Sequence, residues 1–414
     1  MAQSVFIEQY ENGLVLLAEP MDWLKSVTMN VLVPGGNVRD PKELLGLGNF
    51  TCEMVQRGCG SRDSRQFVED LEHLGVVQGG SVSTIFSSFY GAMPSESLHD
   101  SLSIFADLVR RPVLPEDQLD DGRLVCMQEI QSMEDDLAQR VMNEVRRRQY
   151  PEPFGRTSQG TMESMARVSL EHLTDHFNAT YCPNKAILAV AGNLDWPRLR
   201  DQVGELFGDW PIVDLPDITS TPAERGNHHI EHESKQTHIG VAFPTVPYSH
   251  RDYFQARGAV GVLSDGMSSR LFTEVREKRS LCYTVYATLN SLKDEASIIS
   301  YAGTSTERAQ ETLDVLVAEF FRLTKGIHDD ELGRLKALVR SSLIIEQESS
   351  RSRAASIAGD WYHLGRVRSL DEVSQHINDL TVDSINDYLS QNAPRDFTIV
   401  TLGENKLEVP SGVS

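Results

Sequence analysis

Cysteine is scarce in this chain of 414 residues, and long apolar runs are missing from it. Five cysteines, an odd number whose spacing forms no disulfide framework, indicate a reducing cytoplasm as the expected setting. No window reaches about 18 consecutive apolar residues, so no membrane-spanning helix is expected. The first residues, MAQSVFIEQYENGLVLLAEP, lack the basic start, apolar stretch and cleavage site of a signal peptide.

Basic residues are also in short supply. The chain has 39 Lys and Arg against 60 Asp and Glu, which gives a formal net charge of -21. Nucleic acid is therefore not an expected partner, because phosphate binding needs a basic stripe. An acidic surface can keep a protein soluble or steer basic ligands toward it, and the sequence leaves both interpretations open.

What the sequence does contain is a repeat. The length suits about two domains of roughly 200 residues each, and segments of the two halves match at an offset of about 211 residues. Each matched pair has the same predicted structure: a strand, the start of a long helix, and a helix followed by a loop, a strand and a glycine turn. The pairs are Ser26–Val33 with Gln236–Phe243, Gly122–Leu124 with Gly333–Leu335, and 169–193 with 381–405.

The repeat predicts two homologous α+β domains, produced by tandem duplication. Each would hold an antiparallel-rich sheet packed with helices, because strands and helices do not alternate strictly as in a doubly wound parallel sheet. Residues 211–227, PIVDLPDITSTPAERGN, are rich in proline and have no periodic apolar face, which is typical of a linker. We therefore expect domains over 1–212 and 228–414, joined by a linker over 213–227.

A helix predicted to open at Gly46, with the sequence GLGNFTCEM, carries a family resemblance. It resembles the helix on which the insulinase and mitochondrial-processing-peptidase family carries its H-x-x-E-H motif, two zinc-binding histidines and a glutamate base. Here Asn49, Cys52 and Glu53 stand at the first histidine, the base and the second histidine. Glu129 matches the third family ligand. The resemblance thus implies one surviving ligand, no base, and no zinc in this chain.

Two other interpretations of these positions stay open. Asn49, Glu53 and Glu129 could hold a hard ion such as magnesium or calcium, which prefers oxygen ligands, or they could be a hydrogen-bonded polar remnant. Cys52 could be a nucleophile, although no histidine partner is evident in the sequence, or a small buried residue.

The stretch His228–His232 reads H-x-x-E-H literally. The motif works only on a helix, where its first, fourth and fifth residues converge. This copy directly follows the predicted linker and runs into the predicted strand Gln236–Phe243. We therefore expect a polar edge strand here, on which Glu231 points away from both terminal histidines, rather than a zinc site.

The second half contains the most specific match to the family, Gly266–Tyr286, with the sequence GMSSRLFTEVREKRSLCYTVY. In active family members an arginine and a tyrosine seven residues apart reach the substrate near the scissile bond, and Arg276 and Tyr283 have that spacing. Arginine offers several donors for peptide carbonyls, and a tyrosine hydroxyl can donate to an oxyanion. Taken alone, the segment could also be a charged helix end followed by a core tyrosine. The neighbouring Lys278 and Arg279 are expected to be solvated.

The resemblance covers nearly all of the chain and implies a division of labour. Some bacterial members split the site between a zinc-bearing chain and a chain with the arginine–tyrosine pair. The expected function is therefore that of a non-catalytic, substrate-binding subunit that supplies Arg276 and Tyr283 to a homologous partner. Zinc is expected in the partner, as is the sheet edge on which the peptide binds as an added strand.

Two rival functions remain open. The chain could be a structural core-type subunit without a peptidase role, or a self-sufficient zinc peptidase with an unorthodox site. The substrate peptide, and whether the chain forms homodimers without its partner, cannot be read from the sequence.

Overall fold

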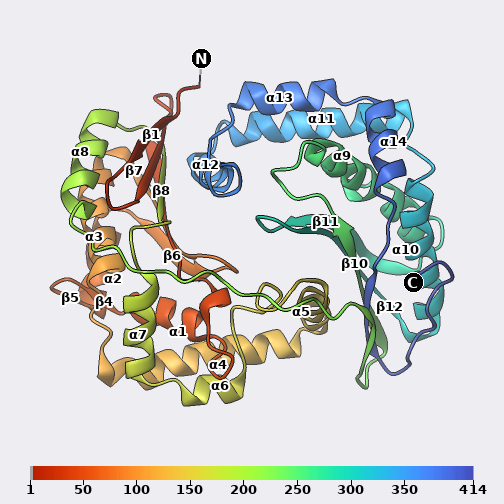
Figure 1. Ribbon diagram of the computed structural model, residues 1–414, viewed down its shortest axis with the longest axis horizontal. Coiled ribbons are helices and arrows are strands. Elements are labelled where there is room, and N and C mark those ends of the chain that lie inside the picture. The colour runs from red at the N-terminus through yellow and green to blue at the C-terminus, as the bar shows by residue number, and fades with distance from the viewer. Residues whose placement is uncertain (1–2, 414) are drawn as a thin grey trace. The chain divides into compact units, whose positions relative to one another are not determined.

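The computed structural model describes residues 3–413, which form two compact units (Figure 1). Unit 1 comprises the residues up to Ser132, Arg156–Thr219 and Ile344–Arg368. Unit 2 comprises Met133–Gly155, Ser220–Leu343 and the residues from Ser369 onward. In the described part of the chain, no helix is long and apolar enough to cross a membrane.

Unit 1 is built on a six-stranded sheet with the order β1-β2-β8-β3-β7-β6. Neighbouring strands are antiparallel except β2 and β8, which are parallel. The strands are β1 (Phe6–Gln9), β2 (Val15–Pro20), β3 (Ser26–Val33), β6 (Val77–Val82), β7 (Ser87–Pro94) and β8 (Ile187–Gly192). Strands β4 (Gly58–Cys59) and β5 (Arg62–Asp63) form a separate small hairpin.

Eight helices belong to the described part of unit 1. They are α1 (Leu47–Val55), α2 (Ser64–His73), α3 (Leu98–Arg110), α4 (Leu119–Asp135), α6 (Met162–Arg167), α7 (Leu170–Thr180), α8 (Trp196–Phe207) and α12 (Ser350–Leu364). The main core contains apolar residues of the sheet, α2, α3 and α8. A separate cluster joins Ile357 and Ala358 of α12 to Leu17 and Ile187 of the sheet. A third cluster joins α1 to α4, which fixes the helix of the predicted degenerate motif.

Unit 2 is built on a five-stranded sheet with the order β11-β12-β10-β13-β9, in which only β9 and β13 pair in parallel. Its strands are β9 (Gly226–Glu231), β10 (Gln236–Thr245), β11 (Cys282–Ser291), β12 (Ala296–Ser305) and β13 (Thr398–Gly403). Its helices are α5 (Leu137–Gln149), α9 (Tyr253–Ser264), α10 (Ala309–Leu323), α11 (Asp329–Glu346), α13 (Leu370–Asp379) and α14 (Val382–Gln391). A π-helical turn, η4 (Phe272–Glu277), precedes β11.

The two sheets confirm the predicted fold class, because they repeat one topology. Strands β6, β7, β3, β8 and β2 of unit 1 follow the same order as β11, β12, β10, β13 and β9 of unit 2. The parallel pair falls at the equivalent place in both sheets. The fold is therefore α+β with two homologous domains, and the predicted strands Ser26–Val33 and Gln236–Phe243 are β3 and most of β10.

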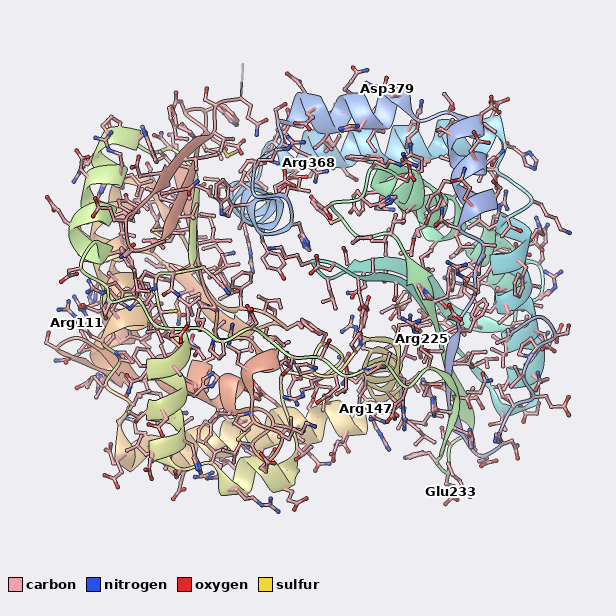
Figure 2. The ribbon with its side chains drawn as sticks, in the orientation of Figure 1. Arg111, Arg147, Arg225, Glu233, Arg368 and Asp379 are labelled. Atoms are coloured by element: carbon pink, nitrogen blue, oxygen red, sulfur yellow. The ribbon has the colours of Figure 1, made fainter. Side chains whose placement is uncertain are left out.

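Each unit takes one helix from the other half of the chain. Helix α5 precedes the predicted linker but packs on β10, β12 and β13, while α12 lies late in the chain but packs on β2, β3 and β8 (Figure 1). Helix α5 is amphipathic: Val141 and Val145 are buried in the cluster that covers the sheet. Arg147, labelled in Figure 2, is partly exposed and pairs with Glu144. The division of the repeat at 213–227 stays a prediction, and the exchange of helices had no signal in the sequence.

Candidate functional site

Helix α1 begins at a tight turn that is stabilised by a buried carboxylate. Gly46, the residue before the helix, has a φ of 89°, which favours glycine over residues with a side chain. The Asp40 carboxylate accepts hydrogen bonds from the backbone N–H groups of Gly46 and Gly48, each at 2.8 Å. It thereby satisfies donors that a helix start leaves free. Phe50 and Met54 pack against α4, so the polar residues between them are held beside that helix.

The structure brings Asn49 and Glu129 into contact, as a shared site would require. The Asn49 Nδ2 donates to Glu129 Oε2 at 2.9 Å and lies 3.9 Å from the Cys126 sulfur. Glu53 instead accepts two hydrogen bonds from Arg57, at 2.8 and 3.1 Å, one helical turn away. Each carboxylate therefore already has a donor from within unit 1: an amide for Glu129 and a guanidinium for Glu53.

Cys52 lies in the main core of unit 1 with 3% of its surface exposed. Burial raises the pKa of its thiol well above the ordinary range, and the nearby Glu53 and Glu129 charges raise it further. Because the thiolate is the reactive form, a thiol held neutral in this way is a poor nucleophile. The geometry fits a small buried residue, the second of the two interpretations that the sequence left open for Cys52.

A zinc ion fits these residues poorly. The Asn49 amide presents its N–H group toward Glu129, and the positive charge of Arg57 lies on Glu53, where a cation would have to bind. Across residues 3–413, no group of three or more His, Cys, Asp or Glu side chains is arranged to hold a metal ion. Asn49 thus satisfies Glu129, and Arg57 satisfies Glu53.

Residues 228–231 of the literal H-x-x-E-H stretch lie on β9, the edge strand next to β13, as predicted, and His232 directly follows the strand. The His229 ring lies 2.9 Å from the Thr401 hydroxyl, and the His228 ring lies 3.2 Å from the backbone oxygen of Glu224. The motif itself consists of His228, Glu231 and His232. Along an extended chain Glu231 points to the opposite face from the two histidines, so the three side chains do not converge.

In unit 2, the family-like segment 266–286 begins as a loop that is anchored on α11. Arg270 donates to both oxygens of Glu331, each at 2.7 Å, and to the backbone oxygen of Gly326 at 2.8 Å. The chain then enters the π-helical turn η4, which contains Arg276. Such turns are rare and occur frequently at functional sites.

Tyr283 lies on a β-bulge at the start of the edge strand β11. Along the ladder, Cys282 pairs with Thr304 while Thr284 pairs with Gly303, so Tyr283 is the extra residue. A β-bulge changes the direction in which a side chain points, and bulges are common next to active sites. The Tyr283 side chain is 82% exposed, which excludes the alternative that it is a core residue.

The Arg276 guanidinium contacts two aromatic rings. Its central carbon is 4.7 Å from the ring centre of Phe272 and 5.0 Å from that of Tyr283, within the range of cation–π attraction. In the described part of the chain, Arg276 has no carboxylate partner. The rings orient the cation and leave its N–H donors available to a ligand.

Lys278 and Arg279 are exposed, as expected of solvated charges, but both also bind one buried carboxylate. Lys278 Nζ and Arg279 Nη1 each donate to the Glu274 carboxylate at 2.7 Å. These bonds hold the pKa of Glu274 at about 2. The sequence pattern did not reveal the buried carboxylate that both of these exposed cations bind. Glu274 lies between Leu271 and Val275, both buried, and this spacing could have signalled a buried carboxylate in need of cations.

Two family models match the chain. The model described as Insulinase (Peptidase family M16) matches residues 18–161, and the model described as Peptidase M16 inactive domain matches residues 167–339. Together they cover most of the sequence.

Relatives and solved structures match over almost their full lengths. An uncharacterized zinc protease of Rickettsia felis is 23% identical, with 98% of this chain and 99% of the relative covered. One of Bacillus subtilis is 24% identical, with 95% and 96% covered. The crystal structure of a peptidase M16 inactive domain from Pseudomonas fluorescens superposes with a TM-score of 0.90 at 20% identity, covering 98% of this chain and 99% of that one. A chain of Complex III2 from Candida albicans gives 0.84 at 16%, covering 97% and 96%. The structural matches show a common fold.

Proposed function

The chain belongs to the insulinase family of peptidases, and from that premise we propose that it is the zinc-free, substrate-binding subunit of a two-chain zinc metallopeptidase. It would supply Arg276 and Tyr283 to the zinc site of a homologous partner that hydrolyses peptides. The observation that carries the proposal is the exposed Tyr283 on a bulge beside an arginine that no carboxylate of the described chain neutralises. Because Tyr283 is exposed and Arg276 has no carboxylate partner there, both side chains are available to a ligand.

Each residue of the pair has a distinct role in this proposal. Arg276 keeps a permanent charge and several N–H donors, so it would hold peptide carbonyl oxygens before and during the reaction. The Tyr283 hydroxyl would donate to the oxyanion that forms when water attacks the peptide carbon. Zinc in the partner would supply the acidified water and polarise the carbonyl. Because Arg276 contacts the Tyr283 ring, the two side chains would approach the substrate together.

A structural subunit is the second candidate, favoured by the fold shared with a chain of Complex III2. A purely structural subunit does not need an exposed tyrosine beside an arginine without a carboxylate partner, and this favours the first proposal. A self-sufficient zinc peptidase has less support, because Arg57 neutralises Glu53 and the literal motif lies on a strand. The cytoplasmic location and the formation of homodimers without a partner stay predictions.

Reconstitution with the zinc-bearing relative tests the proposal. The partner is the homologous chain of the same organism with an intact H-x-x-E-H motif, and its absence from the genome would already count against the proposal. Each chain is purified alone, its zinc content is measured by mass spectrometry, and hydrolysis of a fluorogenic peptide library is followed. We expect about one zinc per partner, none in this chain, and hydrolysis only in the mixture. One zinc in this chain alone, with peptide cleavage that a chelator abolishes, would contradict the proposal.

A further inference from the structure

The backbone that presents Arg276 and Tyr283 is irregular and needs support from outside its own hydrogen bonds. The Lys278 N–H bonds to Thr273 O at 2.9 Å and the Leu281 N–H bonds to Val275 O at 3.0 Å, spacings wider than those of an α-helix. Ser280 has a φ of 51°, in the left-handed region that a residue with a side chain rarely adopts. Such a turn persists only where surrounding contacts determine it.

Glu274 is the charged residue at the base of this turn. It is only 6% exposed, and its two oxygens accept from Lys278 and Arg279, each at 2.7 Å. Arg322 of α10 adds a third cation at 3.5 Å from the carboxylate. Arg279 also donates to the Glu274 backbone oxygen at 2.7 Å, so the chain after the turn is tied back to the turn itself.

We propose that Glu274 is the positioning residue of the Arg276–Tyr283 pair. Its carboxylate binds the cations of Lys278 and Arg279, and this fixes the turn with Arg276 stacked on the Tyr283 ring. Without that charge, Lys278 and Arg279 would lose the carboxylate that they share and would repel each other. Arg322 would keep its ion pair with Glu319 at 3.1 Å, but the turn would lose the bonds that hold it. Arg276 would then leave the ring contacts that orient it. The role in catalysis rests on the proposed function, whereas the effect on the geometry of the turn does not.

Glu274→Gln is the variant that separates charge from packing. Glutamine keeps the shape of the buried side chain and removes the charge. The cations that lose the Glu274 charge can still be hydrated, because the side chains of Lys278, Arg279 and Arg322 are 60%, 39% and 49% exposed. The fold of unit 2 should therefore survive. Glu277→Gln is the matched control, because it changes the net charge equally at an exposed position of the same turn.

The first measurement uses the whole chain without partner or peptide. Hydrogen exchange reports the amides of Lys278 and Leu281, and side-chain NMR of Arg276, assigned through Arg276→Lys, reports the ring-current shift from Phe272 and Tyr283. In Glu274→Gln we expect about tenfold faster exchange in the turn and loss of most of that shift, with α10 and β12 unchanged. Glu277→Gln should match the wild type.

Two results would overturn the proposal. One is a Glu274→Gln chain that keeps both the exchange rates and the Arg276 shift. The other is faster exchange throughout unit 2, which would assign Glu274 to general stability instead.

The reconstituted complex gives a second, separate readout. There, Glu274→Gln should lower turnover about tenfold at an unchanged ratio of the two chains, because the pair is still present but poorly oriented. Unchanged turnover would contradict a positioning role in catalysis. If the mixture is inactive with the wild-type chain as well, the proposed function fails, while the exchange and NMR results still decide whether Glu274 fixes the turn.

Discussion

The α1–α4 contact of unit 1 and the η4–β11 segment of unit 2 both carry polar side chains that the resemblance predicts to stand at functional positions of the family. In unit 1 these side chains have partners within the unit: Asn49 donates to Glu129, and Glu53 binds Arg57. In unit 2 Tyr283 is exposed. Arg276 contacts the rings of Phe272 and Tyr283 and has no carboxylate partner in the described part of the chain. We call Asn49, Glu53 and Glu129 the closed set, because each has a polar partner, and Arg276 and Tyr283 the open set. The two units share a fold but differ in these groups, so the duplication of an architecture does not conserve its chemistry.

The largest expected effect is on the open set. Tyr283→Phe removes only a hydroxyl from a side chain that is 82% exposed, so folding and assembly should be unchanged. If that hydroxyl donates to the oxyanion, turnover of the reconstituted complex should fall about 100-fold while KM changes little. Steady-state kinetics at a saturating ratio of the chains measures both constants. Tyr286→Phe, a nearby partly exposed tyrosine of β11, is the control and should leave turnover within about twofold.

Arg276 should act on binding as well as on turnover. Its guanidinium would contact the peptide before the reaction begins, so Arg276→Ala should raise KM about tenfold, equivalent to roughly 1.4 kcal/mol. Arg276→Lys keeps the charge but loses the planar group that lies over two rings, and it should restore only part of the affinity. A KM equal to that of wild type in Arg276→Ala would show that the arginine does not hold substrate.

Reopening the closed set would sharpen the comparison. Asn49→His, Cys52→Glu and Glu53→His together restore the family motif, with Glu129 as the third ligand. Arg57 would then lose its carboxylate partner and place a positive charge beside the metal. Adding Arg57→Gln should therefore tighten zinc binding about tenfold, a typical size for changes next to metal ligands.

Titration calorimetry measures both affinities, and circular dichroism checks that the variants fold. If neither folded variant takes up zinc, Glu129 is not placed as a ligand. Equal affinities would show that Arg57 does not keep the site closed.

The smallest effect is expected from breaking the closed set. Asn49→Ala removes the amide that donates to Glu129 at a partly buried position, so the free energy of unfolding should fall by at most about 1 kcal/mol. Activity of the reconstituted complex should stay within about twofold. Urea denaturation and the peptide assay measure the two quantities. A loss of activity comparable to that of Tyr283→Phe would mean that unit 1 still contributes to function.

Regular features of the fold followed from sequence pattern. The β-rich run Ser26–Val33 became β3 without a change of bounds, and the motif helix begins one residue after Gly46. The packing of α5 and α12 on sheets from the other half of the chain was missed, because an amphipathic helix shows which face is buried but not what covers it. The bulge at Tyr283 was missed as well. A bulge depends on the register between two strands, which no local pattern of β11 records.

For the candidate sites, one contact followed from the sequence and the others did not. The pairing of Asn49 with Glu129 followed from the family spacing, whereas the ion pair of Glu53 with Arg57 was overlooked although it has the i, i+4 spacing of helical pairs. The burial of Glu274 was not anticipated, and one of the cations near it, Arg322 of α10, lies 48 positions later in the chain.

One titration tests the central claim most directly. The zinc-bearing partner is held at a fixed concentration, and this chain or its Tyr283→Phe variant is added while peptide hydrolysis is measured. The account predicts that both titrations saturate at one chain per partner, with a plateau about 100-fold lower for the variant. Equal plateaus, or a partner as active alone as in the mixture, would contradict the claim that this chain completes the partner's zinc site with Arg276 and Tyr283.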